Sequence, residues 1–482
     1  MPPSNEALAT LTPRQVEILD LVAKGLRNQD VAELLGISLS TVKVHVAAIL
    51  KTLGVSNRTE AVFEYRAALE DEADAMHPIA SVAREVGRPT IAVLPFKDES
   101  QGGPALHLAA ALQQDLVARM SSWRWFPVLS TSATRDLASE QTDFAPLRDG
   151  LGAIWAVVGR IQSQGERFRV HVDLVELATE VVHWSKSHDF CGSEIFELQD
   201  AVCRSIVAEI APELLRADSL VGRGRVVPGF EAWCLASQGM WHVMRATRSE
   251  SAAALAAVER ALGRDPDLVI GWYAAAAARY QRVFHQWSEA PREDLEAFHR
   301  AAARCLELDA MDSSSQEIFG FSRLIDGRHD DAINHLERAV VLNPSNAQAY
   351  SELGQALALS GRPDEGLAHL EESLRLAPTG DSAWSTEGGI AIAHLMADRP
   401  DEAEHWAKRA ISRDPDAAAT YAILAAAQAA GGDTEAAKRT LDDLERLDPA
   451  FDVKRMIQGA RASSPLYGEK LTSAFAAAGL GV

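Results

Sequence analysis

The side chains best suited to chemistry in this 482-residue chain form a short basic stretch near its beginning. From Gly36 to Arg58 there is no Asp or Glu, whereas Lys43 and Lys51 are present with His45 between them. Cationic groups gathered on one face are what contact with the phosphates of nucleic acid requires. The whole chain carries a net charge of −21, which should discourage loose, non-specific association with DNA. The charge pattern therefore indicates a small basic head on an acidic body.

Other reactive side chains lack the spacing of a catalytic or metal site. Asp98, Glu99 and Ser100 follow an apolar run, but neither G-x-x-x-x-G-K-[ST] nor G-x-G-x-x-G occurs, and we interpret Gly102-Gly103 as a turn. The cysteines have no C-x-x-C pair or histidine partners, which is typical of buried reduced thiols; they are Cys191, Cys203, Cys234 and Cys305. Alternation along the strands does not place His171, His183 and His188 on one face, so they are interpreted as surface or edge residues. We predict no enzymatic activity, no cofactor and no metal.

The basic stretch lies within a segment of short helices, residues 1–70. Thr12-Pro13 is a helix start, and Gly25 ends that helix. Asn28 can cap a second helix that Gly36 stops, and Ser38 or Ser40 a third, while Asn57 opens a fourth. The turn Gly36-Ile37-Ser38, followed by a basic helix, predicts a helix-turn-helix. The core side of the third helix is assigned to Val42, Val46, Ile49 and Leu53.

The run from LTPRQ at residues 11–15 to NRTEAV at residues 57–62 resembles the LuxR/FixJ-type DNA-binding domain along its whole length. In that family the third helix lies in the major groove. By position, the resemblance implies that base edges face Lys43, Val44 and Ala47, and that phosphates are held by Thr41, Lys51 and Asn28. Ser40, His45 and Arg58 complete the expected DNA-binding set. The alternative for Lys43 is a solvated surface charge.

Two positions depart from the family pattern. Gln15 stands where the family usually has Glu, which should cost little. Ala47 stands where some members carry Lys, so one contact to a base or phosphate is expected to be missing.

A polar linker, residues 71–87, leads to a segment with a different period, residues 88–217. Apolar or alternating runs predict strands at 90–96, 126–129, 153–162, 167–177 and 181–188, the last three as an antiparallel meander. Helices are expected at about 105–120 and 193–215. This α/β segment resembles the N-terminal domain of TolB as it occurs in cytoplasmic regulators and beside some adenylate cyclases, on the runs IAVLPFKDES and IFELQDAVCRSIVAEIAPEL. The resemblance brings no catalytic residues.

The last segment, residues 229–482, contains a repeat. Similar runs end at Pro344, Pro378, Pro415 and Pro449, which are 34, 37 and 34 residues apart. This is the period of the tetratricopeptide repeat, and with two looser units before them we predict about six helical pairs in an α-solenoid. The apolar end of the chain, LTSAFAAAGLGV, is interpreted as a terminal cap.

Repeat solenoids expose a groove that binds peptides, proteins or small ligands. Four tryptophans crowd into the first two units, and two interpretations stay open: packing inside the repeats, or the lining of an effector groove. They are Trp233, Trp241, Trp272 and Trp287.

The fold class expected is therefore multidomain: an all-α head, an α/β middle domain and an α-solenoid. No apolar run approaches the ~20 residues that span a bilayer, and the N-terminal residues lack the order of a secretory signal, so we expect a cytoplasmic protein. The function expected is transcription regulation by a homodimer on double-stranded DNA, with effector or partner input through the other two segments. A protein-interaction scaffold and a regulatory companion of a signalling enzyme are the alternatives.

Overall fold

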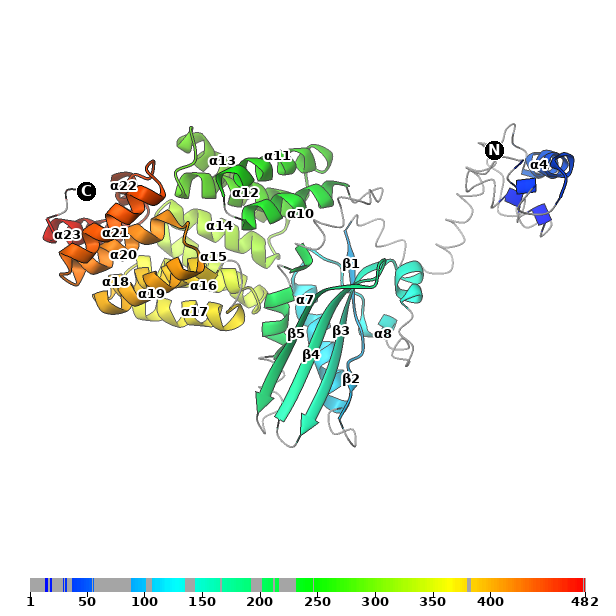
Figure 1. The fold of residues 1–482 in the computed structure, drawn as a ribbon, viewed down its shortest axis with the longest axis horizontal. Helices are drawn as coiled ribbons and strands as arrows, with labels where there is room; N and C mark the ends of the chain where they lie inside the picture. Colours follow the sequence, from blue (N-terminus) through cyan, green and yellow to red (C-terminus); the bar gives the residue numbers. More distant parts are fainter. Residues whose placement is uncertain are drawn as a thin grey trace. The chain divides into compact units, whose positions relative to one another are not determined.

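The computed structural model describes residues 14–15, 18–19, 29, 31–32, 37–53, 55, 88–100, 106–134, 144–164, 167–191, 202–210, 213–215, 231–245, 247–378, 383–479 and 481 (Figure 1). The chain divides into two compact units. One comprises Met1–Glu85 and Ala145–Gly152, and the other comprises Val86–Phe144 and Ala153–Val482. The expected helix starts at Thr12 and Asn57, the ends at Gly25 and Gly54, and the cap at Asn28 lie outside the described residues.

The first unit contains helix α4, Leu39–Leu53. The hydroxyl of Ser38 accepts a hydrogen bond from the Thr41 amide at 3.1 Å, so Ser38 rather than Ser40 is the N-cap. Val42 and Ile49 are seven residues apart, on one side of the helix, and are 0% and 2% exposed. The head therefore has the apolar side predicted for its third helix. A π-helical turn, Pro146–Gly150, belongs to the same unit.

The second unit begins with a five-stranded sheet. Its strands are β1 (Thr90–Val93), β2 (Lys97–Asp98), β3 (Ala153–Gln164), β4 (Arg167–Glu176) and β5 (Val181–Cys191). The two short strands both pair in parallel with β3, whereas β3, β4 and β5 form the expected antiparallel meander. One sheet face is covered by α7 (Leu106–Ser122) and by helical residues 202–210, which share a core cluster with the inward side chains. A short helix, α8, spans Thr131–Thr134.

The strand predicted at residues 126–129 is wrong. The structure has a single bridge there, between Ile91 and Val128. Two hydrogen bonds form it, from the Ile91 amide to the Pro127 carbonyl and from the Leu129 amide to the Ile91 carbonyl, each 2.8 Å. Pro127 has no N–H to donate, so the ladder does not extend.

The rest of this unit is helical. In the described part the helices form seven antiparallel pairs, one more than the estimated six. The bounds are α10 (Glu231–Met244), α11 (Arg248–Arg264), α12 (Val269–Phe284), α13 (Pro291–Leu308), α14 (Ser313–Ile325), α15 (His329–Leu342), α16 (Ala347–Leu359), α17 (Pro363–Leu376), α18 (Ala383–Met396), α19 (Pro400–Arg413), α20 (Ala418–Ala430), α21 (Thr434–Leu447), α22 (Val453–Ser463) and α23 (Pro465–Ala477).

Small residues allow the helices of a pair to approach closely. A Cβ placed on Gly354 of α16 would lie 2.6 Å from the carbonyl oxygen of Gly366 in α17, which real Cβ atoms do not tolerate. Close packing of the two helices therefore requires a glycine at this position.

The sheet and the first helical pairs share one apolar core. Trp125 contacts Tyr273 of α12 edge-on with ring centroids 5.2 Å apart, and Phe126 contacts Trp233 of α10 at 5.0 Å. At the rim, Arg124 forms an ion pair of 2.6 Å with Asp309. The α/β segment and the solenoid are consequently packed as a single body.

Candidate nucleic-acid interface

The outer side of α4 carries the side chains expected to contact DNA. Lys43, Ala47 and Lys51 follow one another at four-residue intervals and are all exposed, and Val44 beside them is 67% exposed. The buried Val42 is on the other side of the helix. An exposed valine between two exposed lysines has no role in the head's own core, and it suits contact with both base edges and phosphates.

The start of α4 is also arranged for an anion. The Ser38 hydroxyl lies 2.7 Å from the hydroxyls of both Ser40 and Thr41, and both of those residues are exposed. The first turn of the helix has no acidic residue and its last turn contains Lys51. The positive end of the helix dipole favours a phosphate at such an end. His45 is half-buried. Asn28 and Arg58 lie outside the described residues.

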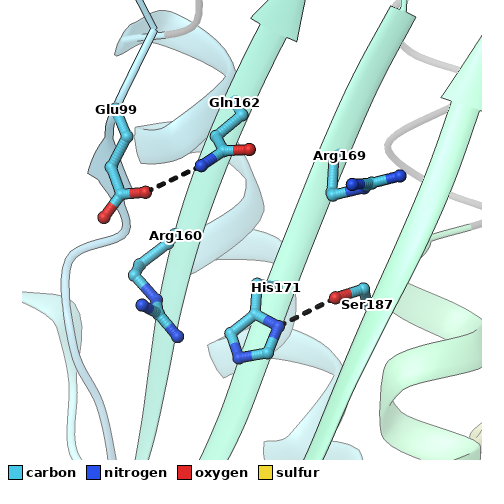
Figure 2. A pocket seen from close by; sticks show the side chains of 6 residues that line it. All are labelled: Glu99, Arg160, Gln162, Arg169, His171 and Ser187. Carbon is cyan, nitrogen blue, oxygen red and sulfur yellow. Dashed lines mark hydrogen bonds between the residues drawn. The ribbon is translucent and has the colours of Figure 1, made fainter.

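A second polar site lies on the open face of the sheet. A hollow of about 200 Å³ is present there. Its lining side chains, drawn in Figure 2, are Glu99, Arg160, Gln162, Arg169, His171 and Ser187. The side chains come from neighbouring strands, because the register places His171 opposite both Arg160 and Ser187. Gln162 donates a hydrogen bond of 3.1 Å to Glu99.

The hollow contains the residue types of a serine hydrolase, but not its full geometry. The His171 ring lies 2.9 Å from the Ser187 hydroxyl through Nδ1 and 3.0 Å from the Asp173 carboxylate through Nε2. Acyl transfer also needs donors preorganised for an oxyanion. The peptide groups of β4 are used in the ladder on both sides, and the two arginines are paired, Arg160 with Asp173 and Arg169 with Asp189. We therefore interpret the hollow as a network of polar surface contacts.

The three histidines are separated, as the sequence indicated. His171 faces the hollow, whereas the imidazole of His183 lies 3.3 Å from the Glu176 carboxylate and packs edge-on against the Trp155 ring. Burial lowers the pKa of His188. Among the residues that the structure describes, no group of three His, Cys, Asp or Glu side chains could hold a metal ion.

The four tryptophans do not share one environment. Trp233 is 2% exposed and packs on Phe126, so of the two interpretations left open packing holds for this residue and the groove does not: its ring fills the junction of sheet and solenoid. The other three are half-buried. Trp272 donates a hydrogen bond of 2.7 Å to the Pro266 carbonyl, Trp241 lies under Arg245, and Trp287 stacks on His285.

Sequence reasoning missed a row of buried acids inside the solenoid. Glu317, Glu352 and Glu387 lie on α14, α16 and α18 and are at most 3% exposed. Burial raises the pKa of Glu317 to about 8 and that of Glu352 well above its usual range. Glu387 instead forms ion pairs of 2.9 Å with Arg409 and Arg413. The signal was present, since the same residue type recurs at 35-residue intervals within the repeat.

Comparison with protein families assigns a regulatory domain to each of the first two segments. Residues 9–64 match the family described as bacterial regulatory proteins, luxR family. Residues 87–205 match the second domain of HilA/YgeH-like transcriptional regulators. Residues 323–381 match the tetratricopeptide repeat. The chain thus combines a LuxR-type helix-turn-helix, a domain known from transcription regulators, and a repeat solenoid.

Two curated relatives match stretches of different length. The response regulator protein VraR of Staphylococcus aureus is 49% identical to this chain over 57 residues. The match covers 12% of this chain and 27% of VraR. The putative adenylate cyclase 3 of Rhizobium meliloti is 24% identical to this chain over 224 residues. The match covers 46% of this chain and 38% of the cyclase. The chain therefore spans about a quarter to two fifths of these relatives.

Two solved structures are similar to part of this chain. The match to the tetratricopeptide protein YrrB covers 41% of this chain and 94% of the YrrB chain, at 16% identity and a TM-score of 0.27. The type IV pilus biogenesis factor PilW covers 47% and 98%, at 18% identity and a TM-score of 0.35. No helix in the described ranges is long and apolar enough to cross a membrane.

Proposed function

We propose that this chain, with its LuxR-type domain, is a sequence-specific DNA-binding transcription regulator that places α4 in the major groove. The observation that carries the proposal is the outer side of α4, where exposed Lys43, Val44, Ala47 and Lys51 stand opposite buried Val42. A helix in the major groove reads bases with such a side and leaves its apolar side in the head.

The proposed division of labour follows from side-chain chemistry. Lys43 donates to guanine O6 or N7, and Val44 and Ala47 contact thymine methyl groups. Thr41 and Lys51 hold phosphates, which fix the position of the helix without reading sequence. Asn28 is proposed as a further phosphate contact.

One helix-turn-helix contacts too few bases for a specific site, and two half-sites are usually read by a dimer. We propose that the chain acts as a homodimer on DNA. A protein or peptide that binds the solenoid is proposed to regulate the chain. Such a partner acts by binding one of two states of the regulator more tightly than the other. We propose that the chain itself has no enzymatic activity.

Crosslinking to chromatin with sequencing tests the function. We expect discrete promoter peaks for the natural chain and their loss in Lys43→Ala. The matched control is Lys97→Ala, which removes an exposed lysine from β2 and should leave the peaks unchanged. Peaks that are diffuse, or that survive Lys43→Ala, contradict the proposal.

The second candidate is a regulatory companion or scaffold of a signalling enzyme. The observation in its favour is the similarity to a protein named as an adenylate cyclase over nearly half of this chain. Absent chromatin signal, together with stable co-purification of such an enzyme, would favour this candidate.

A further inference from the structure

The last helical pair, α22 and α23, does not continue the solenoid. In the earlier pairs the second helix packs on the first helix of the next pair, as α19 packs on α20. α21 and α22 share an apolar cluster that includes Leu444, Val453 and Met456. In addition, α23 packs on α20 and α18, and α22 reaches α14, whereas the pairs before it pack on their neighbours in the stack. The pair has therefore folded back onto first helices of earlier pairs.

An apolar stripe on α23 makes this contact. Tyr467, Leu471 and Phe475 are spaced by four residues, so they lie on one face of the helix, and all are at most 8% exposed. They belong to one apolar cluster with Leu395 of α18 and four alanines of α20, Ala425, Ala426, Ala427 and Ala429. Large side chains on one helix thus meet small side chains on the other. Burial also raises the pKa of the Tyr467 phenol.

Polar contacts at the edge hold the folded-back pair to four consecutive repeat pairs. Gln286, after α12, exchanges two hydrogen bonds of 2.9 and 3.1 Å with the backbone of Asp452. The imidazole of His329 donates to the Ser463 carbonyl at 2.7 Å. The hydroxyl of Ser464 donates to the Leu359 carbonyl at 2.8 Å, and Lys470 forms an ion pair with Asp398.

The corner between α22 and α23 fits against the turns that it crosses. Gly327 has a φ of +72°, and a Cβ there would lie 3.1 Å from the Ala462 carbonyl oxygen. At the next turn, Gly361 has a φ of +91° and faces Leu466. A turn with a larger residue at Gly327 would push the corner away, because both the backbone conformation and the space require glycine.

We propose that the faces of α18 and α20 form a helix-binding surface for a partner protein, and that α23 is its resident occupant. The ligand class is an amphipathic helix with an aromatic residue, a leucine and an aromatic residue at four-residue intervals, which binds by displacing α22–α23. The chain's own helix seated on the surface defines this chemistry. The inference supplies the partner class for the input proposed above, and it does not depend on DNA binding.

The test uses the full chain and a labelled synthetic peptide of residues 453–479 as the partner helix. The double variant Gln286→Ala/His329→Ala removes edge hydrogen bonds and leaves α18, α20 and α23 intact. We expect amides of α22–α23 to exchange with deuterium sooner than those of α20, and about tenfold sooner again in the variant. Fluorescence anisotropy should show peptide binding that is stronger to the variant than to the natural chain.

The matched control protein is Arg292→Ala/Arg300→Ala, which removes two exposed side chains of α13 and should behave like the natural chain. The control peptide replaces Tyr467, Leu471 and Phe475 by Ser and should not bind. If circular dichroism shows that the double variant is unfolded, His329→Ala alone carries the test.

Three results would overturn the proposal. The first is exchange of α22–α23 amides no sooner than those of α20, with no peptide binding. The second is equal binding of both peptides. The third is a dimer of the variant that forms with rising concentration in ultracentrifugation without peptide, since this assigns the surface to a second copy. None of them bears on DNA binding, which the chromatin experiment tests separately.

Discussion

The hydroxyl of Tyr273 donates a hydrogen bond to the carboxyl group of Glu317 at 3.0 Å, inside the repeat solenoid. The two residues come from α12 and α14 and are buried together with Glu352. A carboxyl group held in such surroundings resists ionisation, because burial penalises its charged form. The stability of the solenoid should therefore depend on pH.

The first prediction concerns Glu317. Its folded-state pKa of about 8 lies above the value of an exposed carboxyl, so its contribution is present below about pH 4.5 and is lost as the pH rises through 8. Glu317→Gln should reduce the loss of unfolding free energy between pH 5 and pH 8, measured by urea denaturation. Glu435→Gln, at an exposed position, should retain the slope of the natural chain. An unchanged slope in Glu317→Gln would show that the carboxyl is not protonated in the fold.

His285 should make the folded chain less stable at acid pH, the opposite pH dependence to that of Glu317. Burial lowers its pKa to about 4, against the opposing charge of Asp448. The unfolded chain then binds a proton more readily, so stability is lost as the pH falls from about 6.5 to 4. His285→Phe keeps a ring against Trp287 and should weaken this loss in denaturation at pH 7 and pH 5. A variant as acid-sensitive as the natural chain would contradict the assignment.

Lys43 and Lys51 should differ in their effect on DNA binding. Lys43→Ala should cost about 1–3 kcal/mol at the specific operator, because a base contact is lost. Lys51→Ala should weaken binding to all sequences alike and reduce the salt dependence by about one counterion. Titrations at several salt concentrations measure both. Identical signatures for the two variants would falsify the division of roles.

Ala47→Lys should strengthen DNA binding. The position is exposed on the outer side of α4, so a lysine there does not disturb the head and, if α4 lies in the major groove as proposed, should reach the DNA. A gain of about 1–3 kcal/mol confined to the operator would identify a base contact, and a general gain with a steeper salt dependence would identify a phosphate contact. If neither affinity nor salt dependence changes, position 47 does not face DNA.

Trp125→Ala should loosen the sheet from the solenoid. The side chain is 5% exposed and packs on Tyr273, so its loss should cost about 3–5 kcal/mol. Calorimetry of the natural chain is expected to show the two parts unfolding together, and the variant should show separate transitions. Trp384→Ala, at a half-buried position within the repeats, is the matched control and should keep one transition for the shared body.

Local sequence rules predicted much of this chain. The capping of α4 by Ser38, the burial of Val42 and Ile49, and the three meander strands follow from patterns within a few residues. The repeat was equally visible, because each pair uses the same small and large residues at the same positions. These features depend on helix and strand period, which the chain order fixes directly.

Long-range packing determined the rest. Residue type alone did not show that Trp233 packs on Phe126 rather than lining a groove, or that Glu317 is enclosed beside Tyr273. The apolar end of the chain predicted a cap, yet the contacts of the last helical pair with Gln286 and His329 join residues more than a hundred positions apart. Hydrophobic burial is non-directional. An apolar stripe in the sequence therefore predicts that this face is buried, and only the tertiary structure shows which surface buries it.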